Sequence, residues 1–327
     1  MLTIKVSTSF ANWPFLLQTP KGQGIWGDCR FRVDDPSCQT CDAWIVYEDL
    51  MHAEEVSCPP ERCLFITGEP PFFSYEKSFL KQFPRILTSH SFDHPGVLQE
   101  QQGLPWHIGR VMESDNLRGE KQEDHFKKDF FRESYDSLTQ RELPEKPLLL
   151  SAICSTKRKT PGQILRLRLV EHLKNRLGDR LELFGKGHRP IPCKGDAILP
   201  AKYHLVLENH DAPHYWSEKL ADCYLGWSFP LYWGCSNLEE YFPEKSFLRI
   251  PAEDPERACS LIEAFLEEDP FESRIPLIRQ SRDLVLHKYN FFALACRLVS
   301  SFPRQEPQKV RLLPRKAFRG WRRLYRW

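Results

Sequence analysis

A polar segment between two apolar runs holds the residues whose types and spacing are best suited to chemistry. The apolar runs cover 203–207 and 228–233. Between them lie side chains that carry carboxylate, amide, imidazole, phenol and amine groups, namely Glu208, Asn209, His214, Tyr215, Glu218 and Lys219. This order predicts a strand, a loop, a helix and a second strand, with the polar groups gathered at one end. In an open parallel sheet, ligands bind outside the carboxyl ends of the strands.

The helix expected from Ser217 onward would attract an anion. A helix N-terminus presents free N–H groups and a partial positive charge, which favour a group such as a pyrophosphate. Lys219 would add a full positive charge in the first turn. The alternative is that the aromatic residues and prolines of this segment only pack a core. Core packing, however, does not require the adjacent Glu218 and Lys219.

A helix preceding this segment has boundaries that the sequence marks clearly. It is expected to follow an apolar strand over 148–153. Thr160 and Gln163 match a capping box, Pro161 suits the first helical position, and Gly178 suits the end. An apolar stripe at helical spacing is formed by Leu165, Leu169, Leu173 and Leu177. Strand, helix and strand in succession predict an α/β domain with a parallel sheet.

The order of residues resembles the sugar-nucleotide signature of the α-1,3/1,4-fucosyltransferases, glycosyltransferase family 10, of the bacterial type. The signature consists of an acidic residue or Asn before Asn, a Tyr-x-x-Glu-Lys element, a Pro-led strand ending in Gly, and a Tyr-x-Pro…Ser-Phe tail. The matching parts of this chain are 207–209, 215–219, 230–234 and 241–247. The resemblance implies an α/β fold of two Rossmann-like domains that face each other across a cleft (GT-B type), with the active site in that cleft.

The resemblance also implies a donor site in the second domain. An arginine near the start of the helix after Thr160 binds phosphate in the family, and Arg166 matches it by position, with Arg168 as the alternative. The implied donor-binding residues are Arg166, Asn209, Tyr215, Glu218 and Lys219. The cations would stabilise the departing nucleoside diphosphate, and Glu218 would hydrogen-bond sugar or ribose hydroxyls. Without the family, the arginine would be interpreted as a solvated residue on an exposed face.

Glu69 corresponds to the catalytic base of the family. It follows an apolar run over 64–66 and the pair Thr67 and Gly68, and a glycine beside a carboxylate lets the chain turn sharply. The sequence departs from some relatives at Ile66, where they have a tyrosine that contacts the donor. The implied reaction is a direct displacement with inversion at the anomeric carbon, in which Glu69 takes the proton of an acceptor hydroxyl.

No metal or other cofactor is expected to be obligatory, and GDP-fucose is the expected donor substrate. The resemblance implies that two cations and a helix terminus replace a divalent metal at the diphosphate. Asp34 and Asp35 do not form an Asp-x-Asp motif, and Pro36 after them is typical of a turn. The expected acceptor is an oligosaccharide or a lipid-linked glycan.

The chain has 11 cysteines, which we expect to be the reduced thiols of a cytoplasmic protein. A structural zinc ion is the alternative for the clustered residues Cys38, Cys41, Cys58 and Cys63. The apolar run after Cys63 favours buried thiols without a metal instead.

The 327 residues are enough for two domains, and the composition, with 28% charged residues, is ordinary for a globular protein. The expected organisation is an acceptor-binding α/β domain over 1–117, a charged connection over 118–147, a nucleotide-sugar-binding α/β domain over 148–303 and a basic amphipathic tail over 304–327. The net charge is +2 and the basic excess lies in the tail. This distribution is not that of a nucleic-acid-binding domain, which spreads basic residues over a folded face.

The tail is expected to be a helix that lies on an anionic membrane surface. Aromatic and basic residues would share neighbouring faces of that helix: Arg315, Phe318, Arg319, Trp321, Arg322, Tyr325 and Arg326. The protein would then be cytoplasmic and peripheral on the inner face of the membrane. The alternative is a disordered solubilising tail.

Two other functions fit the sequence. The first is a transferase that uses another nucleotide sugar, with lipopolysaccharide or capsule as its product. The second is a glycan-binding relative without catalysis, which the joint presence of Glu69, Arg166, Glu218 and Lys219 argues against.

Overall fold

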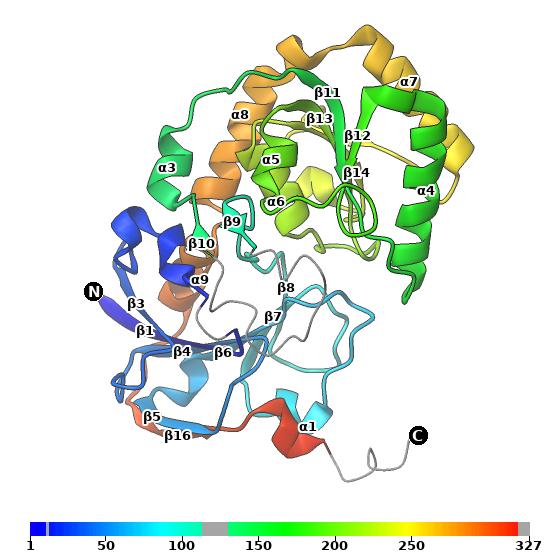
Figure 1. Ribbon diagram of the computed structural model, residues 1–327. Helices are drawn as coiled ribbons and strands as arrows, with labels where there is room; N and C mark the ends of the chain where they lie inside the picture. Colours follow the sequence, from blue (N-terminus) through cyan, green and yellow to red (C-terminus); the bar gives the residue numbers. More distant parts are fainter. Residues whose placement is uncertain (11–12, 113–129, 320–327) are drawn as a thin grey trace. The chain divides into compact units, whose positions relative to one another are not determined.

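The computed structural model describes residues 1–10, 13–112 and 130–319. The chain forms two compact units, of which unit 1 consists of Met1–Leu104 and Asn290–Trp327, and unit 2 of Pro105–Tyr289. Each unit is an α/β structure built on a mainly or wholly parallel sheet (Figure 1). The expected fold class, α/β with two Rossmann-like halves, is thus confirmed by the order of the strands.

Unit 1 contains a seven-stranded sheet in the order β2-β3-β1-β4-β6-β7-β8. Its pairs are parallel except for the antiparallel pair of β2 and β3. The strands are β1 (Leu2–Thr8), β2 (Ile25–Trp26), β3 (Cys29–Val33), β4 (Ala43–Tyr47), β6 (Cys63–Ile66), β7 (Arg85–Thr88) and β8 (Val97–Gln99). A separate antiparallel pair joins β5 (Glu54–Cys58) to β16 (Gln308–Leu312).

The central strand β4 is buried along its whole length, because both faces of the sheet are covered. Ala43, Ile45 and Tyr47 face a core to which helix α9 (Phe291–Ser301) contributes. Trp44 and Val46 face a second core, which contains residues of helix α1 (Lys77–Leu80). Alternation of side chains along the strand therefore supplies two separate cores.

The division of the chain differs from the expected domain boundaries. The expected second domain, 148–303, includes helix α9, but Phe291, Phe292 and Leu294 of this helix are buried in the core of unit 1. The sequence of an apolar helix does not indicate which sheet the helix will cover, so it could not assign α9 to one of the two units. Unit 2 also begins earlier than expected, at Pro105, because Trp106 and Leu138 pack in its core.

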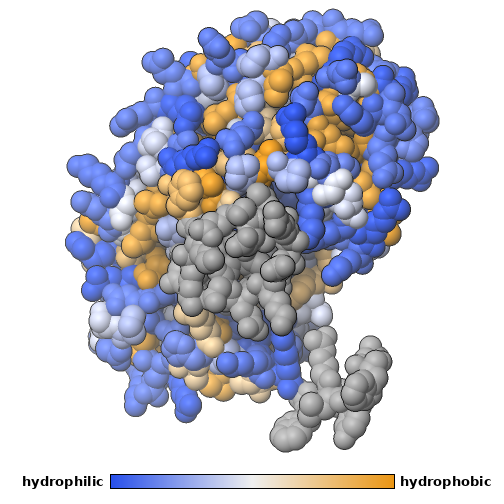
Figure 2. Space-filling view, viewed as in Figure 1, coloured by the Kyte–Doolittle hydropathy of each residue, from blue (hydrophilic) through white to orange (hydrophobic). Residues whose placement is uncertain are grey.

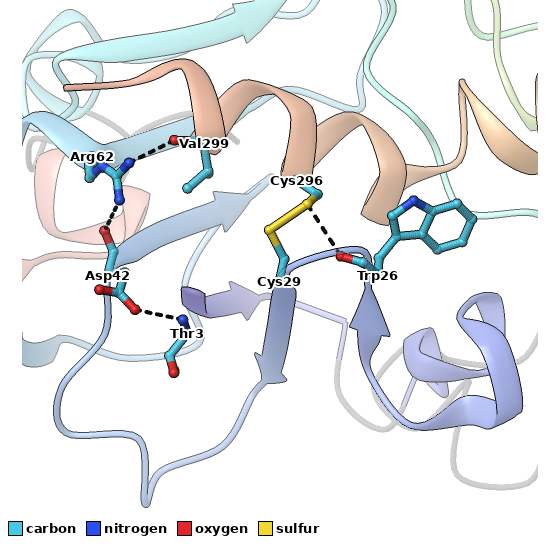
Figure 3. The surroundings of a disulfide bond; sticks show 7 residues. All are labelled: Thr3, Trp26, Cys29, Asp42, Arg62, Cys296 and Val299. Atoms are coloured by element: carbon cyan, nitrogen blue, oxygen red, sulfur yellow. Dashed lines mark hydrogen bonds between the residues drawn. A yellow bond between two sulfur atoms is a disulfide. The ribbon is translucent and has the colours of Figure 1, made fainter. Parts of the chain in front are cut away.

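A disulfide joins α9 to the sheet of unit 1 (Figure 3). It links Cys29 of β3 to Cys296, with 5.9 Å between their Cα atoms. Arg62 strengthens the same connection, since its guanidinium donates to the carbonyl oxygens of Val299 and Phe302 at 3.0 Å each. The expectation of reduced cysteines is therefore wrong for this pair, which only the folded chain brings together.

The other nine cysteines are free and buried. Within the described residues, no group of three or more His, Cys, Asp or Glu side chains is arranged to hold a metal ion.

The expected amphipathic tail is wrong for residues 308–318. They form β16 and a 3-10 turn, η7 (Arg315–Phe318), that packs on unit 1. Arg315 is 5% exposed, lies over the rings of Phe73 and Tyr75, and pairs with Glu76 at 3.1 Å. The pairing of β16 with β5 and the ion pair of Arg315 with Glu76 hold this segment against unit 1. Trp321, Arg322, Tyr325 and Arg326 lie outside the described residues.

Unit 2 is built on a five-stranded parallel sheet in the order β12-β11-β13-β14-β15. Its strands are β11 (Leu148–Ile153), β12 (Leu181–Phe184), β13 (Ala201–Leu207), β14 (Phe229–Trp233) and β15 (Leu248–Arg249). The pair β9 (Arg110–Val111) and β10 (Phe130–Phe131) is antiparallel. The helices are α3 (Tyr135–Gln140), α4 (Pro161–Leu177), α5 (Gly195–Ile198), α6 (Glu218–Leu225), α7 (Pro255–Glu268) and α8 (Phe271–His287).

Helices cover both faces of this sheet (Figure 1). Helices α4 and α7 pack over one face, with Leu205 and Leu207 of β13 beneath them. Helices α6 and α8 pack over the other face, which Val206 of the same strand faces. No helix in the described part of the chain is both long and apolar enough to cross a membrane.

The boundaries of helix α4 predicted from its capping residues are confirmed. It begins at Pro161, and the Thr160 hydroxyl accepts from the N–H of Gln163. Its leucine stripe turns to the sheet, whereas hydrophilic side chains dominate its visible outer surface (Figure 2). Gly178 follows with φ at +55°, a conformation that favours glycine.

Candidate functional site

The carboxyl edge of the unit 2 sheet, where β13 ends and α6 begins, holds four of the residues expected to bind the donor, namely Arg166, Asn209, Glu218 and Lys219. Glu208, the first residue after β13, is fully buried. Its carboxylate accepts from the N–H of Ser217 at 2.8 Å and from the hydroxyl at 2.6 Å. Lys219 Nζ lies 3.4 Å from the same carboxylate. Glu208 thus fastens the strand end to the first turn of α6.

Gly234 makes room for this buried carboxylate. It follows β14, the neighbour of β13, and has φ at +149°. A Cβ atom at this position would lie 2.5 Å from Cγ of Glu208, closer than real contacts allow. The glycine of the resemblance pattern therefore has a packing reason in this chain.

A second ionic group lies beside the first turn of α6. Glu218 Oε1 lies 3.1 Å from Lys194 Nζ and 3.6 Å from Lys219 Nζ, and Asp222 Oδ2 lies 3.5 Å from Lys194 Nζ. Burial opposes the ionisation of Glu218, but the two lysines outweigh it and hold its pKa well below the usual range. Burial raises the pKa of Asp222 to about 6 despite Lys194. The carboxylates and lysines hold one another in place.

Lys194 was not foreseen from the sequence. It precedes the short helix α5 and carries no motif. Only the fold brings it from the β12–β13 connection to α6. Its pKa is raised because Glu218 and Asp222 outweigh the cost of burial.

Arg166 reaches the end of β13 from helix α4. Its Nη1 donates to the side-chain oxygen of Asn209 at 2.6 Å and to the carbonyl of Leu207 at 3.4 Å. Its Nε is buried without a hydrogen-bond partner, and none of the carboxylates in the described residues forms an ion pair with it. Arg168, two positions further along the helix, is exposed. The structure therefore brings Arg166, and not Arg168, to Asn209.

A close backbone approach fixes this arrangement. A Cβ atom on Gly162, in the first turn of α4, would lie 2.1 Å from the carbonyl oxygen of Asn209. Only glycine lets the start of α4 come so near the end of β13. This contact sets the depth at which Arg166 enters the edge of the sheet.

Tyr215 lies inside unit 2. It is 2% exposed, and its N–H donates to the carbonyl of Ala212 at 3.3 Å. His214 before it has φ at +61°, and its ring nitrogen lies 2.6 Å from the hydroxyl of Tyr241. The loop before α6 is thus held by one hydrogen bond of its own and by one to Tyr241, which follows β14. A direct contact between Tyr215 and a donor stays a prediction.

In unit 1, Glu69 follows β6 and is exposed. Its backbone N–H donates to the carboxylate of Glu48 at 2.8 Å, and the N–H of Gly68 donates to the same oxygen. The hydroxyl of Tyr75 donates to Glu48 at 2.9 Å. His90 Nε2 lies 3.0 Å from the carbonyl oxygen of Glu69. These contacts hold the backbone that carries the Glu69 side chain.

Glu48 is the second residue that the sequence did not reveal. It is 8% exposed and has φ at +66°, and burial raises its pKa to about 7 although three donors face it. The residues next to Glu48 in the sequence form no motif. Its hydrogen-bond partners lie in the chain after β6, about 20 or more residues away. It acts on Glu69 through the backbone.

Comparison with known proteins finds no matching family model and no matching curated sequence. Among solved structures, the chain is similar to the crystal structure of an alpha1,3-fucosyltransferase with GDP, at 15% identity and a TM-score of 0.45, over 89% of this chain and 92% of that one. It is similar to a glycosyltransferase from Rickettsia africae ESF-5, at 9% identity and a TM-score of 0.47, over 91% and 96%.

It is also similar to WaaG, a glycosyltransferase involved in lipopolysaccharide biosynthesis, at 10% identity and a TM-score of 0.43, over 92% of this chain and 99% of that one. At such identities and TM-scores, the likeness concerns the arrangement of the chain alone. The fold class rests on this chain's own topology, two α/β units with parallel sheets.

Proposed function

We propose that the protein is a glycosyltransferase that uses a nucleotide-sugar donor, and more specifically that it transfers L-fucose from GDP-fucose to a glycan hydroxyl with inversion. The resemblance of the sequence to family 10 supports the choice of donor. The observation that carries the proposal is that Arg166 has no ion-pair partner among the described residues. Its guanidinium enters the ligand-binding edge of a parallel sheet and contacts only neutral acceptors among the described residues.

The surroundings of Arg166 support a diphosphate at this edge. Helix α6 begins here with Ser217 as its N-cap, and a helix N-terminus favours anions. Lys219 is 25% exposed and is anchored by Glu208, so its amine is oriented without being enclosed. Two cations and a helix terminus would neutralise charge on the departing nucleoside diphosphate. Glu218 would hydrogen-bond sugar or ribose hydroxyls, with Asn209 and Tyr215 beside the donor.

Glu69 of unit 1 is the proposed catalytic base. An exposed carboxylate on an anchored backbone can accept the proton of an acceptor hydroxyl as that oxygen attacks the anomeric carbon. The bond to the diphosphate breaks on the opposite side of the sugar, which inverts the configuration. The linkage would be of the α-1,3 type, and the acceptor an oligosaccharide or a lipid-linked glycan. Each step uses only side chains of this chain and the substrates.

A panel of donors tests the proposal. The full chain is incubated with GDP-fucose, GDP-mannose, UDP-glucose and UDP-N-acetylglucosamine, and release of the nucleoside diphosphate is measured with and without acceptor glycans. We expect release from GDP-fucose. Release from a UDP-sugar alone would move the donor to another class and contradict the fucosyl assignment. Binding of glycans without release from any donor would favour the non-catalytic glycan-binding function.

A further inference from the structure

Unit 2 contains a cavity of about 450 Å³ between the end of α3, the segment that follows it and helix α8. Arg141, Trp227, Arg279 and Arg282 line it, together with the acidic Glu142 and Asp283. Helices α3 and α8 lie side by side within this unit (Figure 1). The volume is in the range of small-molecule sites, roughly 300–1,000 Å³.

This cavity lies away from the candidate donor site. Trp227 precedes β14, at the amino ends of the parallel strands, whereas Arg166 and Lys219 lie at their carboxyl ends. Trp227 has φ at +59°, and its indole N–H donates to the carbonyl of Arg141 at 3.2 Å. The indole is therefore fixed by its own backbone turn and by the chain that follows α3.

Two arginines lie over Trp227. The guanidinium carbons of Arg279 and Arg282 are 5.0 and 4.9 Å from the centre of its ring. Cation–π contacts of this kind fix the planes of both guanidinium groups. Within the described residues, no carboxylate forms an ion pair with Arg279 or Arg282.

Arg282 is the buried arginine of this cavity, and an anion would stabilise its charge. It is 3% exposed, its Nη2 donates to the carbonyl of Leu138, and its Nε is buried without a partner. Burial lowers its pKa to about 10 and the charge of Asp283 opposes this shift, so Arg282 remains charged at neutral pH. The Nε of Arg141, a residue that pairs with Glu133, is also buried without a partner. A buried cation without an ion-pair partner is costly, which favours a ligand that supplies one.

We propose that this cavity binds an oxyanion group, a phosphate or a carboxylate, carried by a small ligand. Arginine forks bind both groups through paired N–H donors, and the stacked indole holds the forks toward the cavity. Glu142 and Asp283 reduce the net positive charge of the cavity, and Arg141 already pairs with Glu133, so the arginines proposed to bind the oxyanion are Arg279 and Arg282. The proposal does not depend on the function proposed above.

Calorimetry at fixed ionic strength tests the site with inorganic phosphate and with glucuronate, and with glucose as the neutral control. We expect at least one oxyanion, and not glucose, to bind the full chain. Arg279→Gln removes an exposed arginine of the cavity and should weaken binding by about tenfold or more, as expected for the loss of one charge-assisted hydrogen bond. Arg257→Gln, which changes an exposed arginine of α7 that does not line the cavity, is the matched control and should leave binding unchanged.

Two further variants separate the explanations. Arg282→Met should abolish binding, with circular dichroism to check its fold, and Arg279→Gln carries the test if Arg282→Met unfolds. Lys219→Gln should retain the oxyanion signal, because it lies at the opposite edge of the sheet. Phosphate binding that is lost in Lys219→Gln but kept in Arg279→Gln would overturn the proposal. So would the absence of any heat from both oxyanions. Preference for phosphate or for glucuronate identifies the source of the group.

Discussion

Replacing Glu208 by alanine should destabilise unit 2 far more than any exposed charge change. The substitution leaves the N–H and the hydroxyl of Ser217, a residue 2% exposed, without the acceptors that lie at 2.8 and 2.6 Å. An unsatisfied buried donor costs about 1–3 kcal/mol, so the pair should lower the free energy of unfolding by about 2–6 kcal/mol. Lys219 adds little, because its side chain is 25% exposed and water can solvate the amine.

The assay is urea unfolding followed by far-ultraviolet circular dichroism and tryptophan fluorescence. Glu208→Gln keeps an acceptor oxygen and should cost less than alanine does. Glu182→Ala is the matched control, because it breaks an exposed ion pair with Arg189 in the same sheet and should cost less than about 1 kcal/mol. If Glu208→Ala unfolds within about 1 kcal/mol of the unchanged protein, Glu208 does not fasten β13 to α6 and the reasoning is refuted.

Three other outcomes are expected. Glu69→Gln should leave GDP affinity unchanged while transfer falls by about 10²–10⁴, measured as product formation, and a near-normal rate would assign the base elsewhere. The raised pKa of Glu48, about 7 against 4.5, means that its contribution to stability is fully present below pH 4.5 and is lost as the pH rises through 7. The unfolding free energy relative to Glu48→Gln should therefore fall over that window, and a flat difference would contradict the burial argument. Truncation of 304–327 should lower the melting temperature because it removes β16, and an unchanged melting temperature would show that β16 is dispensable.

The sequence was informative where local rules decide the structure. Helix α4 was predicted from Thr160, Pro161 and Gly178, since caps act within one turn of a helix. The strand ends that carry Glu69 and Asn209 were predicted because apolar runs stop where polar residues begin. These signals require no knowledge of the rest of the chain.

The remaining features depend on partners distant in sequence. The choice between Arg166 and Arg168 needs the direction in which α4 packs, which the close contact of Gly162 with Asn209 sets. Lys194 and Glu48 have no motif, because their partners come from other loops. The disulfide and the packing of α9 depend on which sheet an apolar helix covers. The start of the tail was misinterpreted because the partners of Arg315, among them Glu76, are distant in sequence.

The most direct test of the central claim is the affinity for GDP, measured by calorimetry on the full chain and on Arg166→Ala, Lys219→Ala and Arg168→Ala. We expect the unchanged protein to bind GDP and the first two substitutions each to weaken binding by about tenfold or more, the effect of losing one charge-assisted contact to phosphate. Arg168→Ala should bind as the unchanged protein does, because Arg168 is exposed on another part of α4. Unchanged GDP affinity in both Arg166→Ala and Lys219→Ala would contradict a diphosphate site at this edge of the sheet.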